Sequence, residues 1–132
     1  MQNITLQILV NTLRSSWGVD TARTPSEWSE LNPARGQCVI SSLIVQDYFD
    51  GELVRLKVLG EDIDETHFCN LLDGGVLIDT TVSQYQTPVS QTRKPEKLEG
   101  YTSTRERLLA DDDTLRRYTL LKSRVDTQLV SL

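Results

Sequence analysis

Two segments of the chain carry apolar residues roughly three or four positions apart, the spacing of one face of a helix. The first predicts an amphipathic helix over residues 3–15. The second predicts a helix that opens at Cys38 and ends at Asp50-Gly51, where turn residues begin. The apolar face of this second helix consists of Ile40, Leu43, Ile44 and Tyr48. Its β-branched residues also suit a strand, so the helical period decides the prediction.

The pattern changes to strict alternation after the second helix. Residues 52–58 alternate apolar and polar side chains, which predicts a half-exposed strand. Two short apolar runs follow, at residues 66–72 and 76–81. The segment Asp73-Gly74-Gly75 separates them and is typical of a hairpin turn. We therefore expect antiparallel strands in the middle of the chain.

The other segments lack a clear period or return to a helical one. Residues 15–37 predict an irregular connection anchored by two tryptophans, and the polar, proline-containing residues 84–100 predict a surface loop. Ser103 and Glu106 predict a capping box at the start of a helical tail. The tail's apolar stripe is Leu115, Tyr118, Leu121 and Val125. Together these elements predict one α+β domain over residues 1–132, with a small antiparallel sheet packed against helices.

Composition narrows the function classes. The 132 residues are 38% hydrophobic and 25% charged, as in an ordinary globular protein. The net charge of -5 opposes binding to nucleic acid or to an anionic membrane. The chain shows no secretory signal pattern and no apolar run long enough to span a bilayer. With only two cysteines, we expect a cytoplasmic protein with free thiols rather than a disulfide framework.

Cys38, His67 and Asp79 lie on three successive predicted elements and form a candidate catalytic set. A thiol reacts as the thiolate, and a helix N-terminus or a nearby imidazolium favours that form. The Cys38 N–H, early in its helix, could also donate to a developing oxyanion. Asp79 would accept from one imidazole nitrogen while the other nitrogen meets the thiol.

The spacing of His67 and Asp79 gives a test of this hypothesis. They are 12 positions apart within one predicted hairpin. Because side chains alternate faces along a strand, both emerge on one face only if the loop has an odd number of residues. The loop Asp73-Gly74-Gly75 meets this condition, and a two-residue loop Gly74-Gly75 does not. In the odd register Asp79 lies opposite Cys69 and diagonal to His67.

The residues around this set resemble those of known proteins. Gly36-Gln37-Cys38, His67-Phe68-Cys69-Asn70 and Gly75-Val76-Leu77-Ile78-Asp79-Thr80-Thr81 look like the core of transglutaminase-like proteins. Those proteins share the chain order Cys, His, Asp with papain-like peptidases. A closer resemblance, to the small bacterial YunG-like family, rests on residues 32–38, 44–49, 79–81, 84–85 and 117–121 and on Trp17 with Asp20-Thr21.

The resemblance implies a transglutaminase-like or papain-like core and a Cys38-His67-Asp79 triad. The implied activity is hydrolysis or transfer of an acyl group from a small-molecule or peptide substrate, without a metal or other cofactor. Gln37, Trp17 and Gln84 are candidates for oxyanion or substrate contacts. The pattern specifies no oligomeric state.

Other interpretations of the same residues stay open at this point. The framework could serve a binding or interaction module without catalysis. Cys38, Cys69, His67 and Asp79 are together an acceptable chemical set for zinc, although their spacing matches no compact zinc motif. Cys38 and Cys69 could form a redox pair, without a C-x-x-C motif in support. For Cys69 alone, we favour packing in the core.

Overall fold

The structure is a computed structural model that describes residues 3–132. Met1 and Gln2, which open the segment considered for a secretory signal, lie outside the described residues. Within residues 3–132, the α-helices are α1 (Leu6–Ser16), α2 (Cys38–Phe49), α3 (Thr104–Leu109) and α4 (Asp112–Val130). The strands are β1 (Glu52–Gly60), β2 (Ile63–Leu72), β3 (Val76–Ile78) and β4 (Val89–Lys94). Single 3-10 turns occur at Pro25–Glu27 and Val82–Gln84.

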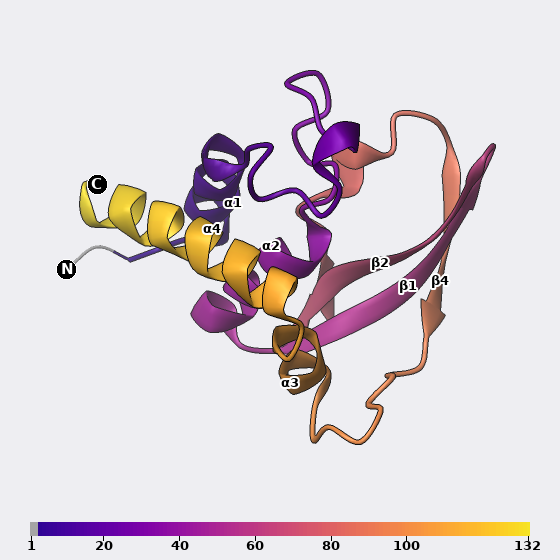
Figure 1. Cartoon of the computed structure of the whole chain (residues 1–132). Helices are drawn as coiled ribbons and strands as arrows, with labels where there is room; N and C mark the ends of the chain where they lie inside the picture. Colours follow the sequence, from indigo (N-terminus) through magenta and orange to yellow (C-terminus); the bar gives the residue numbers. More distant parts are fainter. Residues whose placement is uncertain (1–2) are drawn as a thin grey trace.

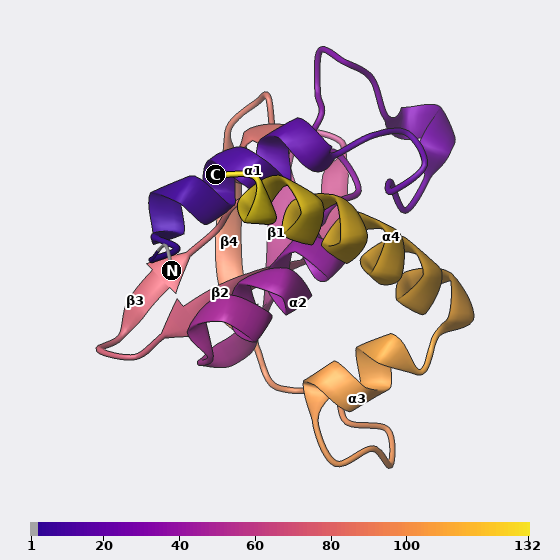
Figure 2. The same ribbon diagram turned by 90° about the vertical axis from the view of Figure 1, so that its left-hand side faces the viewer.

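The strands form one antiparallel sheet in the order β3-β2-β1-β4, and the helices gather on one side of it (Figure 1). Helix α2 lies between the sheet and the pair α1 and α4, as the turned view also shows (Figure 2). The predicted α+β class and the antiparallel sheet are therefore confirmed. No helix within residues 3–132 is long and apolar enough to cross a membrane.

Helix α2 is the centre of the core. Ile40, Leu43, Ile44 and Val45 are all fully buried. Ile44 packs in a cluster with α1 and α4, whereas Leu43 packs in another with Phe68 of the sheet. A helix with partners on both sides has apolar residues all round, which is why its sequence also suited a strand.

The hairpin of β2 and β3 has the predicted odd loop. Asn70 pairs with Ile78 and Leu72 pairs with Val76, so three residues, Asp73 to Gly75, form the turn. The parity condition on His67 and Asp79 is thereby met. Strand β3 ends at Ile78, earlier than the predicted residue 81, and Asp79 follows it directly.

Two sequence predictions are wrong. Residues 84–100 are not only loop, because β4 pairs with β1 at the edge of the sheet. Most β4 side chains are exposed, so the strand has no alternating apolar pattern to reveal it. In α4, Leu121 and Val125 are buried as predicted, but Leu115 is 44% exposed because it lies off the face that packs on α1 and α2.

Candidate active site

Cys38, His67 and Asp79 reach the site from three different elements. Cys38 is the first residue of α2, His67 lies within β2, and Asp79 follows the last residue of β3. Continuing the β2–β3 register places Asp79 opposite Cys69, diagonal to His67 and on the same face. The Asp79 Oδ2 lies 2.7 Å from the His67 Nε2, a hydrogen-bond distance.

The imidazole of His67 is held in one orientation. Its side chain is fully buried, and the Tyr85 ring packs edge-on against it with centroids 5.3 Å apart. The Asp79 carboxylate is itself fixed, because its Oδ1 accepts a hydrogen bond from the Thr81 N–H at 3.2 Å. With Nε2 engaged by Asp79, Nδ1 is the nitrogen left to act on another group.

The surroundings of His67 favour its charged form. Burial lowers the pKa of His67, but hydrogen bonds with Asp79 and Cys38 outweigh it and raise the pKa to about 10. These contacts therefore favour the imidazolium over the neutral ring. Because Nε2 is bound to Asp79, Nδ1 is the ring nitrogen through which His67 can interact with the Cys38 sulfur.

Gln84 approaches the same nitrogen. Its Nε2 lies 3.3 Å from the His67 Nδ1, and its Oε1 accepts from the Arg35 Nη1 at 3.3 Å. An amide N–H can donate to Nδ1 only when the imidazole is neutral, whereas a thiolate accepts from the protonated ring. Gln84 thus stabilises the neutral imidazole of His67, whereas a Cys38 thiolate stabilises the imidazolium.

Arg35 anchors this end of the site through two carboxylates. Its guanidinium lies 2.7 Å from Glu65 and 2.8 Å from Glu27. The hydrogen bond to Glu65 is the largest cause that raises the pKa of Arg35, so the cation is permanent. Burial raises the pKa of Glu65, but hydrogen bonds from Arg35 and Tyr85 outweigh it and lower the pKa. These partners lie on separate loops and strands, and no spacing in the sequence linked them.

A cavity of about 260 Å³ opens beside the half-buried Cys38. Gln84, Tyr85, Glu65 and Arg35 line it together with Cys38. A substrate carbonyl group entering here would meet the sulfur and the network that holds the imidazole. The volume lies just below the range of ordinary ligand pockets, so this cavity suits the reacting group of a substrate rather than a whole large ligand.

The other two proposed oxyanion contacts lie elsewhere. The Gln37 side chain is fully buried, where its Oε1 accepts from Thr21 and its Nε2 donates to the Gly18 carbonyl. The Trp17 Nε1 donates to the Ser41 Oγ at 2.9 Å. Both side chains tie residues 17–21 to α2, and neither lines the Cys38 cavity. Of the three candidates, only Gln84 reaches it.

Cys69 has apolar surroundings, as favoured from the sequence. It is 1% exposed and packs with Val54 and Leu56, and burial raises the pKa of its thiol to about 12. Within residues 3–132, no group of three or more His, Cys, Asp and Glu side chains is placed to hold a metal ion. The alternative set of four zinc ligands therefore does not assemble.

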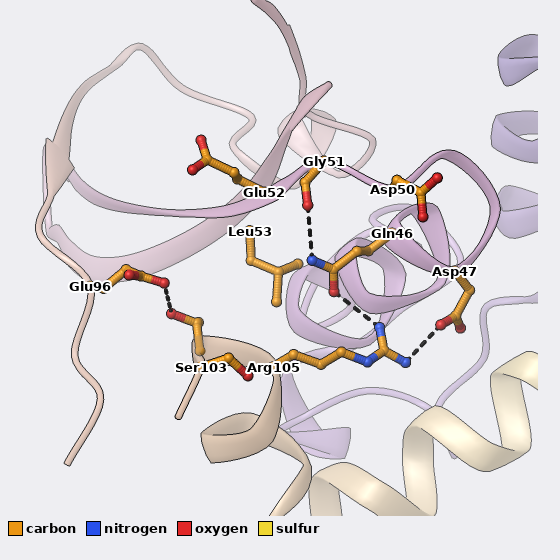
Figure 3. Close-up of a pocket in the computed structure, with 10 residues that line it drawn as sticks. Gln46, Asp47, Asp50, Gly51, Glu52, Leu53, Glu96, Ser103 and Arg105 are labelled. Carbon is orange, nitrogen blue, oxygen red and sulfur yellow. Dashed lines mark hydrogen bonds and ion pairs between the residues drawn. The ribbon is translucent and has the colours of Figure 1, made fainter. Parts of the chain in front are cut away.

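A larger pocket of about 550 Å³ lies between the end of α2 and α3 (Figure 3). Arg105 crosses it and donates to the Gln46 Oε1 at 3.1 Å and to the Asp47 Oδ1 at 2.6 Å. The Gln46 amide in turn donates to the Gly51 carbonyl. Its polar groups thus pair largely with one another, and neither a cysteine nor a histidine lines it. The Cys38 cavity therefore remains the candidate active site.

Comparison with known proteins places the chain in a family. The family model described as YunG protein matches residues 5–130. The chain belongs to the YunG family. It is 34% identical, over 88 residues, to the uncharacterized protein YunG of Bacillus subtilis (strain 168), an alignment that covers 66% of this chain and 69% of that protein. No solved structure matches the chain. The YunG family brings no assigned reaction with it, so function has to be argued from the site.

Proposed function

We propose that this protein is a cysteine-dependent acyl hydrolase or acyltransferase. Cys38 is the nucleophile, His67 the acid and base, and Asp79 the group that orients the imidazole. The observation that supports this most is the 2.7 Å bond between the His67 Nε2 and Asp79, which leaves Nδ1 as the ring nitrogen for Cys38, a residue that lines a cavity. In this proposal the α2 helix and the β2–β3 hairpin correspond to a transglutaminase-like or papain-like core.

The first chemical step is attack of the Cys38 sulfur on a substrate carbonyl carbon. A carbon–sulfur bond forms, and the carbonyl electron pair moves to oxygen. When the intermediate collapses, the bond to the leaving amine, alcohol or thiol breaks, and the His67 Nδ1 supplies the proton that this group needs. Asp79 stabilises the imidazolium before the transfer and keeps the ring aligned.

The start of α2 supplies the most direct oxyanion donor. Gln37 precedes the helix without a side-chain cap, so the first N–H groups, including that of Cys38, lack a capping acceptor. An N–H at this position carries part of the positive end of the helix dipole. The Gln84 amide lines the same cavity and can add a second donor once it leaves Nδ1.

The second step resolves the thioester on Cys38. Neutral His67 takes a proton from water or from an amine, and the activated oxygen or nitrogen attacks the acyl carbon. The carbon–sulfur bond breaks, the acid or amide leaves, and the proton on His67 restores the imidazolium and thiolate pair. Water gives hydrolysis and an amine gives transfer, with the same three residues in both.

The test measures iodoacetamide labelling of Cys38 by mass spectrometry between pH 5 and pH 10, in the background Cys69→Ala. Those pH limits span the ordinary range of a histidine and a free thiol, about 6.5 to 8.5. We expect labelling near neutral pH to be fast and to slow by about tenfold or more in His67→Ala, because the imidazolium favours the thiolate.

An acyl panel completes this test. Incubation with thioester, ester and amide substrates should leave an acyl adduct on Cys38, and Cys38→Ser should abolish turnover. Labelling that occurs only in alkali or after unfolding, at the same rate in His67→Ala, would refute the enzyme proposal. The same framework would then suit a binding module instead.

A further inference from the structure

A second cavity adjoins the Cys38 cavity. Its volume is about 570 Å³, and Arg23 and Thr66 line both cavities. Val39, the residue after Cys38, also lines it. A ligand that places a reacting carbonyl at the sulfur can therefore extend its remaining atoms past Arg23 into this second space.

The second cavity has the opposite charge to the whole protein. Five cationic side chains and two carboxylates line it, although the chain carries a net charge of -5. The cations are Arg23, Arg55, Lys97, Arg107 and Arg117, and the carboxylates are Asp111 and Asp113. A local excess of cations in an acidic protein concentrates anions at that place.

The two carboxylates already have other partners. Asp111 caps α4 by accepting from the Thr114 N–H at 2.9 Å. Asp113 pairs with Arg117 at 2.8 Å and with Arg116 at 2.9 Å. Neither carboxylate is therefore committed to Arg23, Arg55 or Arg107.

Three arginines of the cavity lack an anionic partner. Within residues 3–132, neither Arg23, Arg55 nor Arg107 forms an ion pair with a carboxylate. The Arg55 Nη1 donates to the Pro95 carbonyl at 3.4 Å. The Arg107 Nε is buried and has no hydrogen-bond partner among residues 3–132. A buried donor without an acceptor is costly, and an anionic ligand would supply the missing acceptor.

From these observations, and resting on the proposed function, we infer that the acyl substrate carries an anionic group, a carboxylate or a phosphate, bound by Arg23, Arg55 and Arg107. The guanidinium fork matches the planar or tetrahedral oxygens of such a group. The apolar side chains of Phe68 and Leu108 line the same cavity and can cover the carbon chain between the anion and the carbonyl. The second cavity thus binds the anionic end of the substrate, and Cys38 in the first cavity reacts with its carbonyl group.

The test uses the charge of an alkylating probe. Three iodoacetamide reagents have tails of equal length that end in a carboxylate, a phosphate or a neutral carboxamide. In each, the Cys38 sulfur displaces iodide, and adduct formation on Cys38 is followed by mass spectrometry in Cys69→Ala. We expect at least one anionic reagent to react about tenfold faster than the neutral one, as one charge-assisted contact allows. The anionic reagent that reacts faster shows whether the site prefers a carboxylate or a phosphate. Added salt should reduce the ratio of anionic to neutral rates.

Substitutions of the arginines test whether these residues cause the preference for anionic reagents. Arg55→Gln and Arg107→Gln should each reduce the ratio of anionic to neutral rates to about threefold or less. Arg14→Gln is the matched control, because it removes the same charge from an exposed position on α1. Thermal unfolding checks that the variants fold, and Arg55 alone suffices if Arg107→Gln does not fold.

The outcomes separate the two proposals. Fast labelling by all three reagents, without charge preference or with a preference that the arginine variants leave intact, would overturn the anion inference and keep the enzyme proposal. Slow labelling by the neutral reagent at neutral pH would count against the enzyme proposal. Even then, the ratio of anionic to neutral rates still reports whether the arginines bind the anion.

Discussion

The two cysteines lie in contrasting surroundings within one small fold. Cys38 opens a helix without a side-chain cap, faces a buried imidazole and borders a cavity. Cys69, two residues beyond His67 on the same strand, is packed against Val54 and Leu56, and the pKa of its thiol is raised to about 12. The same side chain is thus held as a neutral apolar group at one position and beside a cation at the other. The contrast indicates that position, rather than residue type, decides which thiol is reactive.

Removing each sulfur in turn should give the largest contrast. In Cys38→Ala, formation of the acyl adduct should fall below detection, a loss of about 10⁴-fold or more, because no other side chain in the cavity can replace the nucleophile. In Cys69→Ala, the rate should stay within about threefold of the wild type, since that sulfur only fills space. Equal losses in both variants, with both folded, would remove the distinction.

Replacing the imidazole should have the next largest effect. His67→Gln keeps a polar side chain in the buried position but cannot carry the charge or transfer the proton. We expect acyl turnover to fall by about 10²- to 10⁴-fold, the range for general acid–base groups. A steady-state assay on the best substrate of the panel measures this loss. If turnover drops less than threefold, His67 is not the base.

Asp79→Asn should have a smaller effect of the same kind. An amide can keep the bond to the His67 Nε2 but removes the charge that stabilises the imidazolium. Turnover should fall by about tenfold or more, and the pH optimum should move downward, because loss of the Asp79 charge lowers the pKa of His67. Thr81→Val is a useful control, since it removes a hydroxyl near Asp79 but keeps the carboxylate. A loss in the control as large as in Asp79→Asn would point to local disorder instead.

Serine substitutions should destabilise the protein more at Cys69 than at Cys38, although activity depends more on Cys38. Cys69→Ser places a hydroxyl among apolar side chains at a position that is 1% exposed, and should lower the free energy of unfolding by about 1–3 kcal/mol. Cys38→Ser, at a half-buried position beside a polar cavity, should cost less than about 1 kcal/mol. Urea denaturation of both variants measures the difference. A larger cost at Cys38 would contradict the assignment of Cys69 to the core.

Much of the fold was predicted from the spacing of apolar residues along the chain. The arrangement of the central site was tied to the alternation of side chains along the strands. Side-chain alternation predicted that His67 and Asp79 share a face only if the hairpin loop is odd, and the loop at residues 73–75 meets that condition. Strand β4 was missed because an exposed edge strand has no apolar alternation. The Gln37 side chain lies against Thr21 and Gly18 instead, because nearness to Cys38 along the chain does not show which way a side chain points.

The supporting network of the site could not be predicted, for a related reason. Arg35 meets Glu65 and Gln84 across 30 and 49 positions of sequence, and an ion pair over such distances leaves no pattern in a single chain. The unpaired arginines of the second cavity likewise became recognisable only when burial and partners were known.

The most direct test of the central claim is the titration of His67 by nuclear magnetic resonance. His67 is the only histidine in the chain, so its ring signals need no assignment by mutation. If the sulfur, imidazole and carboxylate form one hydrogen-bonded set, the pKa of His67 lies well above 6.5, toward about 10, and falls in Cys38→Ala. A pKa of His67 near 6.5 that is the same in both proteins would contradict the account.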